Sequence, residues 1–373
     1  MSEDGQRRMF EGKLRGASVW ALEDGWDLEV WGVRAVDEPA TGSRFRTRGP
    51  RLPLPGQPLR VLLLNVVHLG LVLRHPRHGV LLATGGWNTA GAALALRVTG
   101  RRAPLVLRVN IHSAGDGLQR RGHRFLPRFV LAAERYALRT ADVVVTVGAS
   151  TTQFARELGV ATDRIVEQPR VVAKRGDDDA RLERVPSRDA MLVVCAARLE
   201  PRKAVDVLLH AFARVVAAHP EARLEVAGEG SESNALGALT TRLGLDRSVV
   251  FRGGLKQRDM PDFYARASVF VLPSRGDEGL PKVVVEAALA GCAVVGTEVR
   301  GTTELVVPGV TGELVPPDDP VALGRALTEL LGDPVRVARL AAAAGPVALA
   351  HQERAHLMGN ELERRIRALV AHR

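Results

Sequence analysis

Short apolar runs alternate with amphipathic segments throughout residues 190–296. The runs at 191–196, 223–227, 249–251, 269–272 and 293–295 have the length and composition of buried strands. The segments between them carry apolar residues at helical spacing, which predicts helices over 205–218, 235–243, 260–267 and 281–290. Regular alternation of strand and helix is typical of a parallel sheet covered by helices. The second half of the chain is therefore predicted to form a doubly wound α/β domain.

The first half of the chain shows the same alternation less regularly. Strands are predicted at 28–33, 60–64, 80–83, 105–109 and 143–147, and helices at 91–98 and 124–139. Residues 1–12 hold no strand-like run, and residues 16–25 have the pattern of a helix. The alternation predicts a second doubly wound, Rossmann-like domain.

A length of 373 residues suits two domains. Residues 173–189, with three consecutive aspartates and little apolar content, have the composition of an exposed linker. Leu357, Leu362, Ile366 and Leu369 are spaced as on one face of a helix. We predict domains at 1–174 and 175–350, with a helix at 351–373 that returns to the N-terminal domain.

Composition limits where the chain works. No continuous apolar stretch of about 18 residues is present, so no membrane span is predicted. The only two cysteines, Cys195 and Cys292, each lie in an apolar run, which predicts buried thiols and not a disulfide or a metal site. These features predict a cytoplasmic protein.

The positive charge is concentrated in one half of the chain. Residues 1–188 hold 30 Lys and Arg against 19 Asp and Glu, while residues 189–373 hold 22 against 23. Nucleic acid, an anionic membrane or an anionic substrate would each explain the excess, and so would an arginine-rich composition without a partner. Aromatic residues are not interleaved with the basic ones, so we expect no nucleic-acid partner.

The segment 118–139 offers a local explanation for this charge. Its apolar residues form a stripe at helical spacing, and six arginines surround the stripe. That pattern suits a helix docked on an anionic membrane, which would place the protein peripherally at the inner face of the membrane. The alternative, which we favour, is an ordinary core-facing helix with solvated arginines.

The segment 274–287 carries the densest chemistry of the chain. A predicted strand ends at Leu272, a glycine-containing loop follows, and a predicted helix begins near Pro281. Backbone N–H groups at a helix start bind phosphate or sugar oxygens. Glu278 lies in the loop, and Glu286 lies in an apolar part of the helix, where a carboxylate needs a polar partner such as a ribose hydroxyl. Alternatively, both glutamates only complement the helix dipole.

The spacing of Glu278 and Glu286 closely resembles that of the family 4 retaining glycosyltransferases of the GT-B fold. Further blocks resemble this family in the same order along the chain; they lie at 197–203, 226–230, 251–254, 271–274, 290–297, 301–306 and 309–315. The resemblance implies two Rossmann-like domains facing across a cleft. It also implies a nucleotide-diphosphate sugar donor and a sugar, lipid-linked or small-molecule acceptor. The product would be a glycan such as a polysaccharide, or else a glycolipid or a glycosylated metabolite.

The resemblance also implies roles for individual residues. Arg198 and Lys203 would hold the donor diphosphate, Glu278 would bind hydroxyls of the transferred sugar, and Glu286 would bind the ribose. The backbone of Gly279 and Leu280 would contact the donor, as would Gly253 and Thr297 in their own blocks. Cations are unfavourable at a helix N-terminus, so their position there indicates an anion between them. Two cations stabilise a diphosphate leaving group without a metal, and we expect no cofactor.

Catalysis is expected to involve the first half of the chain as well. The family often carries a histidine after the strand predicted at 105–109, and His112 is the candidate, with Asp116 second. Glu304 ranks below Glu278 and Glu286 as a functional carboxylate. No residue stands out as a covalent nucleophile, so we expect front-face attack assisted by the leaving phosphate, with retention of configuration.

The chain departs from the family in two places. The first strand and its glycine-rich loop are missing from the pattern, and Ala293 stands where proline is common. A catalytically impaired GT-B partner subunit, a GT-B-like nucleotide-sugar epimerase and a phosphorylase therefore stay open as alternatives.

Overall fold

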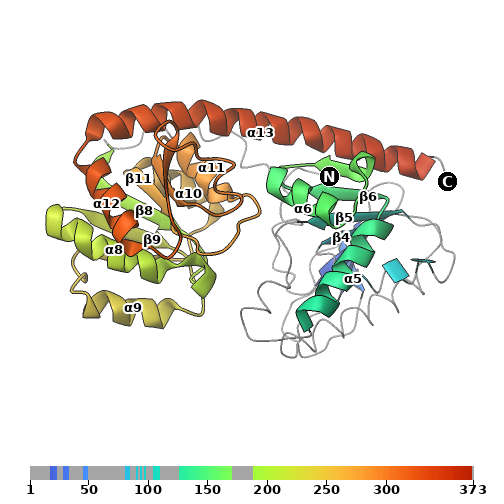
Figure 1. Cartoon of the computed structure of the whole chain (residues 1–373), viewed down its shortest axis with the longest axis horizontal. Helices are drawn as coiled ribbons and strands as arrows, with labels where there is room; N and C mark the ends of the chain where they lie inside the picture. The colour runs from blue at the N-terminus through green and yellow to red at the C-terminus, as the bar shows by residue number, and fades with distance from the viewer. Residues whose placement is uncertain are drawn as a thin grey trace. The chain divides into compact units, whose positions relative to one another are not determined.

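The computed structural model describes residues 17–22, 28–32, 45–48, 80–84, 90, 93–94, 96–97, 104–109, 126–169 and 188–371. The chain divides into two compact units (Figure 1). Unit 1 comprises Met1–Gln168 and Gly359–Arg373, and unit 2 comprises Pro169–Met358. The predicted strand at 60–64, His112, Asp116 and the linker up to residue 187 lie outside the described residues.

Unit 2 is built on a six-stranded parallel sheet with the strand order β10-β9-β8-β11-β12-β13. Its strands are β8 (Asp189–Ala196), β9 (Arg223–Ala227), β10 (Val249–Gly253), β11 (Ala267–Leu272), β12 (Ala293–Thr297) and β13 (Gly312–Val315). All six residues of β11 are buried, as expected for a central strand covered on both faces. The strands predicted for this half are confirmed.

Helices cover both faces of this sheet (Figure 1). They are α8 (Val205–Ala218), α9 (Ser233–Arg242), α10 (Met260–Ala265), α11 (Lys282–Leu289), α12 (Pro320–Leu331) and α13 (Pro334–Ala371), with short 3₁₀ turns η2 (Pro201–Lys203) and η3 (Gln257–Asp259). The main core joins one face of the sheet to α8, α9, α12 and the start of α13. The opposite face carries α10 and α11.

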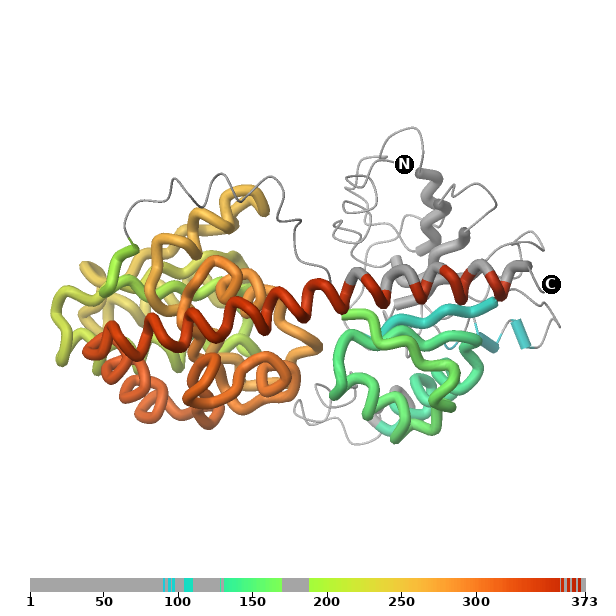
Figure 2. The backbone as a smooth tube through the Cα atoms, turned by 90° about the horizontal axis from the view of Figure 1, so that it is seen from above, coloured from blue at the N-terminus to red at the C-terminus, as the bar shows by residue number. Residues whose placement is uncertain are grey.

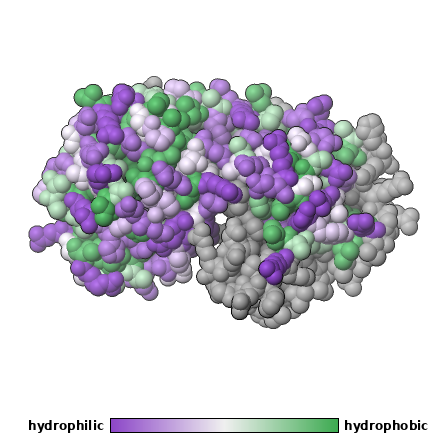
Figure 3. All heavy atoms as spheres, in the orientation of Figure 1, coloured by the Kyte–Doolittle hydropathy of each residue, from purple (hydrophilic) through white to green (hydrophobic). Residues whose placement is uncertain are grey.

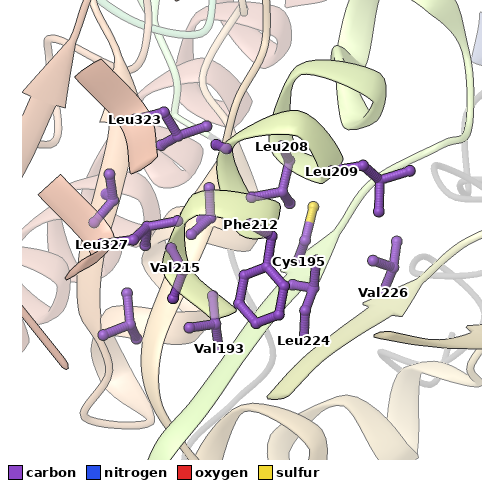
Figure 4. Packing of buried hydrophobic residues seen from close by; sticks show 14 of the residues in the cluster. Val193, Cys195, Leu208, Leu209, Phe212, Val215, Leu224, Val226, Leu323 and Leu327 are labelled. Carbon is purple, nitrogen blue, oxygen red and sulfur yellow. The ribbon is translucent and has the colours of Figure 1, made fainter. Parts of the chain in front are cut away.

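The centre of the main core is Phe212 of α8. Figure 4 shows its ring with Val193 and Leu224 of the sheet on either side, and Leu323 and Leu327 of α12 complete the cluster. Phe212 is fully buried, which stabilises the fold by about 1.5–3 kcal/mol relative to an exposed side chain. On the face of unit 2 visible in Figure 3, hydrophilic and hydrophobic residues are interspersed.

Unit 1 contains a seven-stranded sheet with the order β3-β2-β1-β4-β5-β6-β7. Its strands are β1 (Ala17–Leu22), β2 (Leu28–Gly32), β3 (Phe45–Arg48), β4 (Val80–Thr84), β5 (Leu105–Val109), β6 (Val143–Thr146) and β7 (Ile165–Glu167). Strands β4 to β7 are parallel, whereas β1 is antiparallel to both β2 and β4.

The helix predicted over residues 16–25 is wrong, because Ala17–Leu22 is strand β1. The run is short, contains Val19 and Trp20, and is followed by Asp24-Gly25, a sequence typical of hairpin turns. The strand beside β4 is therefore this antiparallel hairpin strand. Among the described residues, no parallel first strand lies next to β4.

The described parts of unit 1 include the helices α5 (Leu126–Thr140) and α6 (Ala149–Glu157) and a 3₁₀ turn η1 (Thr162–Arg164). Near its C-terminal end, α13 lies beside the strands (Figure 2), where Ile366 packs with Val106 and Val143. Leu362 and Leu369 pack on the same cluster, whereas Leu357 is 67% exposed.

Helix α5 covers most of the arginine-rich segment 118–139, for which membrane docking and core packing are the two alternatives. Ala137 and Leu138 are fully buried in the core of unit 1, and Tyr136 packs against it. Arg128, Arg135 and Arg139 are exposed. The described part of the apolar stripe therefore faces the core, which supports the core-facing alternative. No helix in the described parts of the chain is long and apolar enough to cross a membrane.

Candidate functional site

The segment 273–281 lies at the edge of the unit 2 sheet where the parallel strands end. It connects β11 to α11, and Thr297 at the end of neighbouring β12 donates a hydrogen bond from Oγ1 to the carbonyl oxygen of Ser274, at 2.5 Å. Both Thr297 and Ser274 are buried. The hydroxyl of Thr297 therefore fastens the loop to the sheet, and open α/β sheets bind their ligands at this edge.

Glu278 is the centre of a buried charged cluster in this loop. Its Oε1 accepts hydrogen bonds from Lys203 Nζ and Ser274 Oγ, each at 2.6 Å, and lies 3.4 Å from a guanidinium nitrogen of Arg202. Only 6% of Glu278 is exposed. Among the described residues, none donates to the other oxygen, Oε2. That oxygen is the one left to accept a hydrogen bond from a ligand hydroxyl.

Lys203 is brought to Glu278 by an unusual start to helix α8. Ala204 adopts a left-handed backbone conformation (φ 51°) between η2 and α8, which costs about 1–2 kcal/mol for a residue other than glycine. This turn directs Lys203 toward the loop that holds Glu278, and only 11% of the lysine side chain is exposed. The site therefore has one largely buried cation at the N-terminus of a helix.

The electrostatics of the pair favour two charged groups. Burial alone would raise the pKa of Glu278, but the charges of Lys203 and Arg202 and the hydrogen bonds to the carboxylate outweigh it, so the pKa lies below its ordinary value. Burial is also the largest influence on the pKa of Lys203, which it lowers, and Glu278 only partly compensates. The positive charge of Lys203 is therefore only partly compensated by Glu278. A bound anion would complete the compensation.

Two backbone amides lie beside Glu278 at the start of α11. Within the described part of the chain, no acceptor is found for the N–H groups of Gly279 and Leu280, which precede α11. Gly301 lies against this turn with φ +86°, and a Cβ there would come within 2.5 Å of the carbonyl oxygen of Glu278. Since only glycine fits, Gly301 allows the backbone of the loop to fold as it does.

The other predicted donor residues lie at the same edge of the sheet with different surroundings. The side chain of Arg198 is 67% exposed and pairs with Glu200 at 2.5 Å. Gly253 ends β10 with φ +66°, and its carbonyl accepts from the amide of Gly228 at 2.8 Å. An exposed, long side chain such as Arg198 can reorient toward a ligand at little cost.

Glu286 projects from α11 and already has two hydrogen-bond donors. Tyr264 Oη donates to its Oε2 at 3.0 Å, and Gln257 Nε2 donates to its Oε1 at 3.3 Å. The predicted need for a polar partner is therefore met partly by the protein itself. The sequence does not single out Tyr264, because a lone tyrosine at the end of a short apolar helix has the pattern of a core residue.

Arg275 is a second residue to which the sequence pattern gives no role. Its guanidinium contacts Asp206 at 2.8 Å, Asp318 at 2.6 Å and the carbonyl oxygen of Pro201 at 2.7 Å. Arg275 thereby ties the loop that carries Glu278 to the start of α8, which carries Lys203. The only feature of the sequence that could have indicated this role is the position of Arg275 between Ser274 and Glu278.

Together these groups have the chemistry of a candidate site for an anionic, hydroxyl-rich ligand. The ammonium of Lys203 and the amides of Gly279 and Leu280 suit phosphate oxygens, and the carboxylates of Glu278 and Glu286 suit hydroxyl donors. Both cysteines are buried elsewhere in unit 2, where burial raises the pKa of Cys195 to about 12 and that of Cys292 to about 11.

Comparisons with known proteins agree with this fold. Residues 190–333 match the family "Glycosyl transferases group 1", and residues 15–170 match the family "Glycosyl transferase 4-like domain". Together these two matches cover most of the chain. The two α/β sheets with their helices are those of the GT-B glycosyltransferase fold. The chain belongs to the group 1 glycosyltransferases, as its sequence motifs predicted.

One relative with an assigned activity shares about a third of its residues with this chain over the matched region. The chain is 34% identical over 237 residues to a GDP-mannose-dependent alpha-(1-6)-phosphatidylinositol monomannoside mannosyltransferase of Mycolicibacterium smegmatis. That match covers 57% of this chain and spans only 60% of the relative's length.

Two solved structures share the fold at 21% identity. The complex of Anabaena HepE with UDP superposes with a TM-score of 0.63, covering 84% of this chain and 86% of the other. Sucrose-phosphate synthase of Thermosynechococcus elongatus superposes with a TM-score of 0.69, covering 92% and 90%. At this identity the likeness establishes the GT-B fold alone.

Proposed function

We propose that this glycosyltransferase transfers a hexose from a nucleotide-diphosphate sugar to an acceptor hydroxyl with retention of configuration, and that its donor binds in unit 2. The observation that carries the proposal is the Lys203–Glu278 ion pair, at 2.6 Å. It lies beside the amides of Gly279 and Leu280, for which no acceptor is found among the described residues. A cation and two amides suit a diphosphate, and a carboxylate next to them suits the hydroxyls of the attached sugar.

Each group has a definite task in this mechanism. Lys203, with Arg198 swinging in from its exposed position, neutralises the diphosphate as it gains charge on departure. The Oε2 atom of Glu278 accepts from a sugar hydroxyl and fixes the ring, while Oε1 stays with Lys203 and Ser274. Gly253 and Thr297 complete the donor side through their loops.

Retention is proposed to proceed by front-face attack. The acceptor hydroxyl approaches on the side from which the diphosphate leaves, and a leaving phosphate oxygen takes its proton. No metal is needed in this scheme, because Lys203 and Arg198 supply the positive charge. His112, which lies outside the described residues, is the candidate to contact the sugar near its reactive carbon.

The acceptor is proposed to be a hydroxyl of a glycan, a glycolipid or a glycosylated metabolite, in keeping with the name of the mycobacterial relative. We propose a cytoplasmic enzyme. We also propose that this enzyme contacts an anionic membrane. The residues that would make this contact are the exposed Arg128 and Arg135 of α5. Flotation with anionic liposomes at low salt tests that contact, and protein left out of the lipid fraction would contradict it.

The test of the transferase proposal is product analysis. The protein is incubated with UDP-, GDP- and ADP-hexoses and a panel of mannose-terminated lipids and soluble hexosides, and the anomeric proton of the product is read by NMR. An α-linked product from an α-linked donor is expected; a β-linked product would contradict retention.

The same experiment separates the alternatives. Nucleotide binding without any product would favour a catalytically impaired partner subunit. A change of sugar configuration without an acceptor would favour an epimerase. Release of a hexose 1-phosphate from one of the hexosides, once inorganic phosphate is added, would favour a phosphorylase.

A further inference from the structure

The two oxygens of the Glu286 carboxylate have different surroundings. Oε2 accepts from the hydroxyl of Tyr264 at 3.0 Å, in a part-buried contact, and Oε1 accepts from the side chain of Gln257 at 3.3 Å, in an exposed one. The shorter and more buried bond is therefore on Oε2. The longer and exposed bond is on Oε1, where a ligand can reach.

Tyr264 is held rigidly. Only 1% of it is exposed, its ring packs edge-on against Phe263 and Phe270 with centroids 5.7 Å apart, and its carbonyl oxygen accepts from the thiol of Cys292 at 3.1 Å. Burial, and next the charge of Glu286, raise the pKa of Tyr264 well above its ordinary value. The phenol is thus a fixed donor that stays protonated at neutral pH.

Gln257 is held much more loosely. It is exposed, it lies in the short 3₁₀ turn η3, and its amide makes the longer of the two bonds. A hydrogen bond of this length on an exposed side chain is readily exchanged for a ligand hydroxyl.

We propose that Tyr264 is a positioning residue, which holds Oε2 of Glu286 so that Oε1 faces the ribose of the donor, and that Gln257 occupies Oε1 only until the ribose hydroxyl displaces it. This inference rests on the proposed function, because it takes the donor to be a nucleotide. The inference predicts an effect on binding of the ribose hydroxyls alone. The contacts of Lys203 with the diphosphate would be unchanged.

The test compares Tyr264→Phe with a matched control. Tyr136→Phe is that control, since Tyr136 is the only other tyrosine, and its buried hydroxyl has no hydrogen-bond partner among the described residues. The dissociation constants of the best-binding nucleoside diphosphate and of its 2′,3′-dideoxy analogue are measured by calorimetry for each protein. Circular dichroism melts confirm that the variants are folded.

Tyr264→Phe is expected to weaken the ribonucleotide about three- to tenfold while leaving the dideoxy analogue unchanged. Tyr136→Phe is expected to change neither. Equal weakening of both ligands would overturn the proposal, because a structural role would act on both alike. Unchanged binding of the ribonucleotide would overturn it as well.

Gln257→Ala tests the second half of the inference. Because the glutamine is displaced on binding, its removal is expected to leave ribonucleotide affinity unchanged or to tighten it up to about threefold. A loss of affinity greater than about threefold would show that Gln257 contacts the nucleotide, and would overturn its displacement. Failure of the wild-type protein to bind any nucleoside diphosphate would instead reject the proposed function itself, and this inference with it.

Discussion

Lys203 and Glu278 form a buried ion pair, with Nζ 2.6 Å from Oε1, although 75 residues separate them in the chain. The pair joins the start of α8 to the loop before α11, so the segments that follow the neighbouring strands β8 and β11 are fixed relative to one another. Burial of a charged pair is favourable only when each partner is satisfied. Here Oε1 of Glu278 is satisfied by Lys203, Arg202 and Ser274.

Breaking one half of this pair is expected to cost more than removing both halves. Lys203→Met leaves Glu278 buried without its nearest cation and should lower the free energy of unfolding by about 3 kcal/mol. The double variant Lys203→Met/Glu278→Gln should recover about half of that loss, because a neutral amide needs no cation. Urea denaturation of Lys203→Met, Glu278→Gln and the double variant measures the coupling free energy between the two residues. Additive losses would contradict it.

The loop that carries Glu278 is expected to tolerate no side chain at Gly301. Gly301→Ala combines a left-handed φ of +86° with a Cβ 2.5 Å from the Glu278 carbonyl, and should destabilise unit 2 by about 3 kcal/mol or more and weaken donor binding. Gly309 is the matched control, because its φ is +73° and a Cβ there would meet no atom within 4 Å. Gly309→Ala should therefore cost only about 1 kcal/mol. Equal melting temperatures for the two variants would refute the packing argument.

The stability of the protein should depend on pH through Glu278. Its folded pKa lies below the ordinary value of 4.5, so the unfolded chain takes up the proton first as pH falls. The contribution of the ionised carboxylate is therefore complete above about pH 4.5 and is lost as pH falls through the folded pKa. Free energies of unfolding of wild type and Glu278→Gln, measured between about pH 7 and pH 3, should converge over that window. Curves that stay parallel would contradict the shift.

Much of this fold could be predicted from the sequence, and the reason is physical. In unit 2 the central strand β11 is buried on both faces, so the run at 269–272 is continuously apolar and stands out from the amphipathic helices. In unit 1, the sequence of strand β1 resembles a helix, because six residues are too few to show a period clearly. A strand order that places β1 beside β4 also depends on long-range pairing.

The site was predictable in its residue types but not in its contacts. Motif spacing singles out Glu278, Lys203 and Glu286. It misses Tyr264, since the hydrogen bond of this residue to Glu286 joins α10 to α11 and leaves no trace in local periodicity. Which oxygen of a carboxylate is occupied depends on three-dimensional packing, and no sequence pattern carries that information.

His112 is expected to act on catalysis and not on donor binding. His112→Ala should lower the rate constant of sugar transfer by about a hundredfold or more, with the affinity for the nucleoside diphosphate unchanged, because the histidine is proposed to lie near the reactive carbon and not near the diphosphate. Steady-state kinetics and calorimetry on one preparation measure both quantities. Loss of nucleotide affinity would place His112 in the donor site instead.

The central claim, that Lys203 and its neighbours bind a nucleotide diphosphate in unit 2, is tested most directly by calorimetry. UDP, GDP and ADP are titrated into the wild-type protein, Lys203→Ala and, as a control on the adjoining helix α8, Arg214→Ala. We predict micromolar binding of one nucleotide to wild type and Arg214→Ala, and a loss of about a hundredfold or more in Lys203→Ala. Binding of equal strength in Lys203→Ala, or no binding of any nucleotide to wild type, would contradict the account.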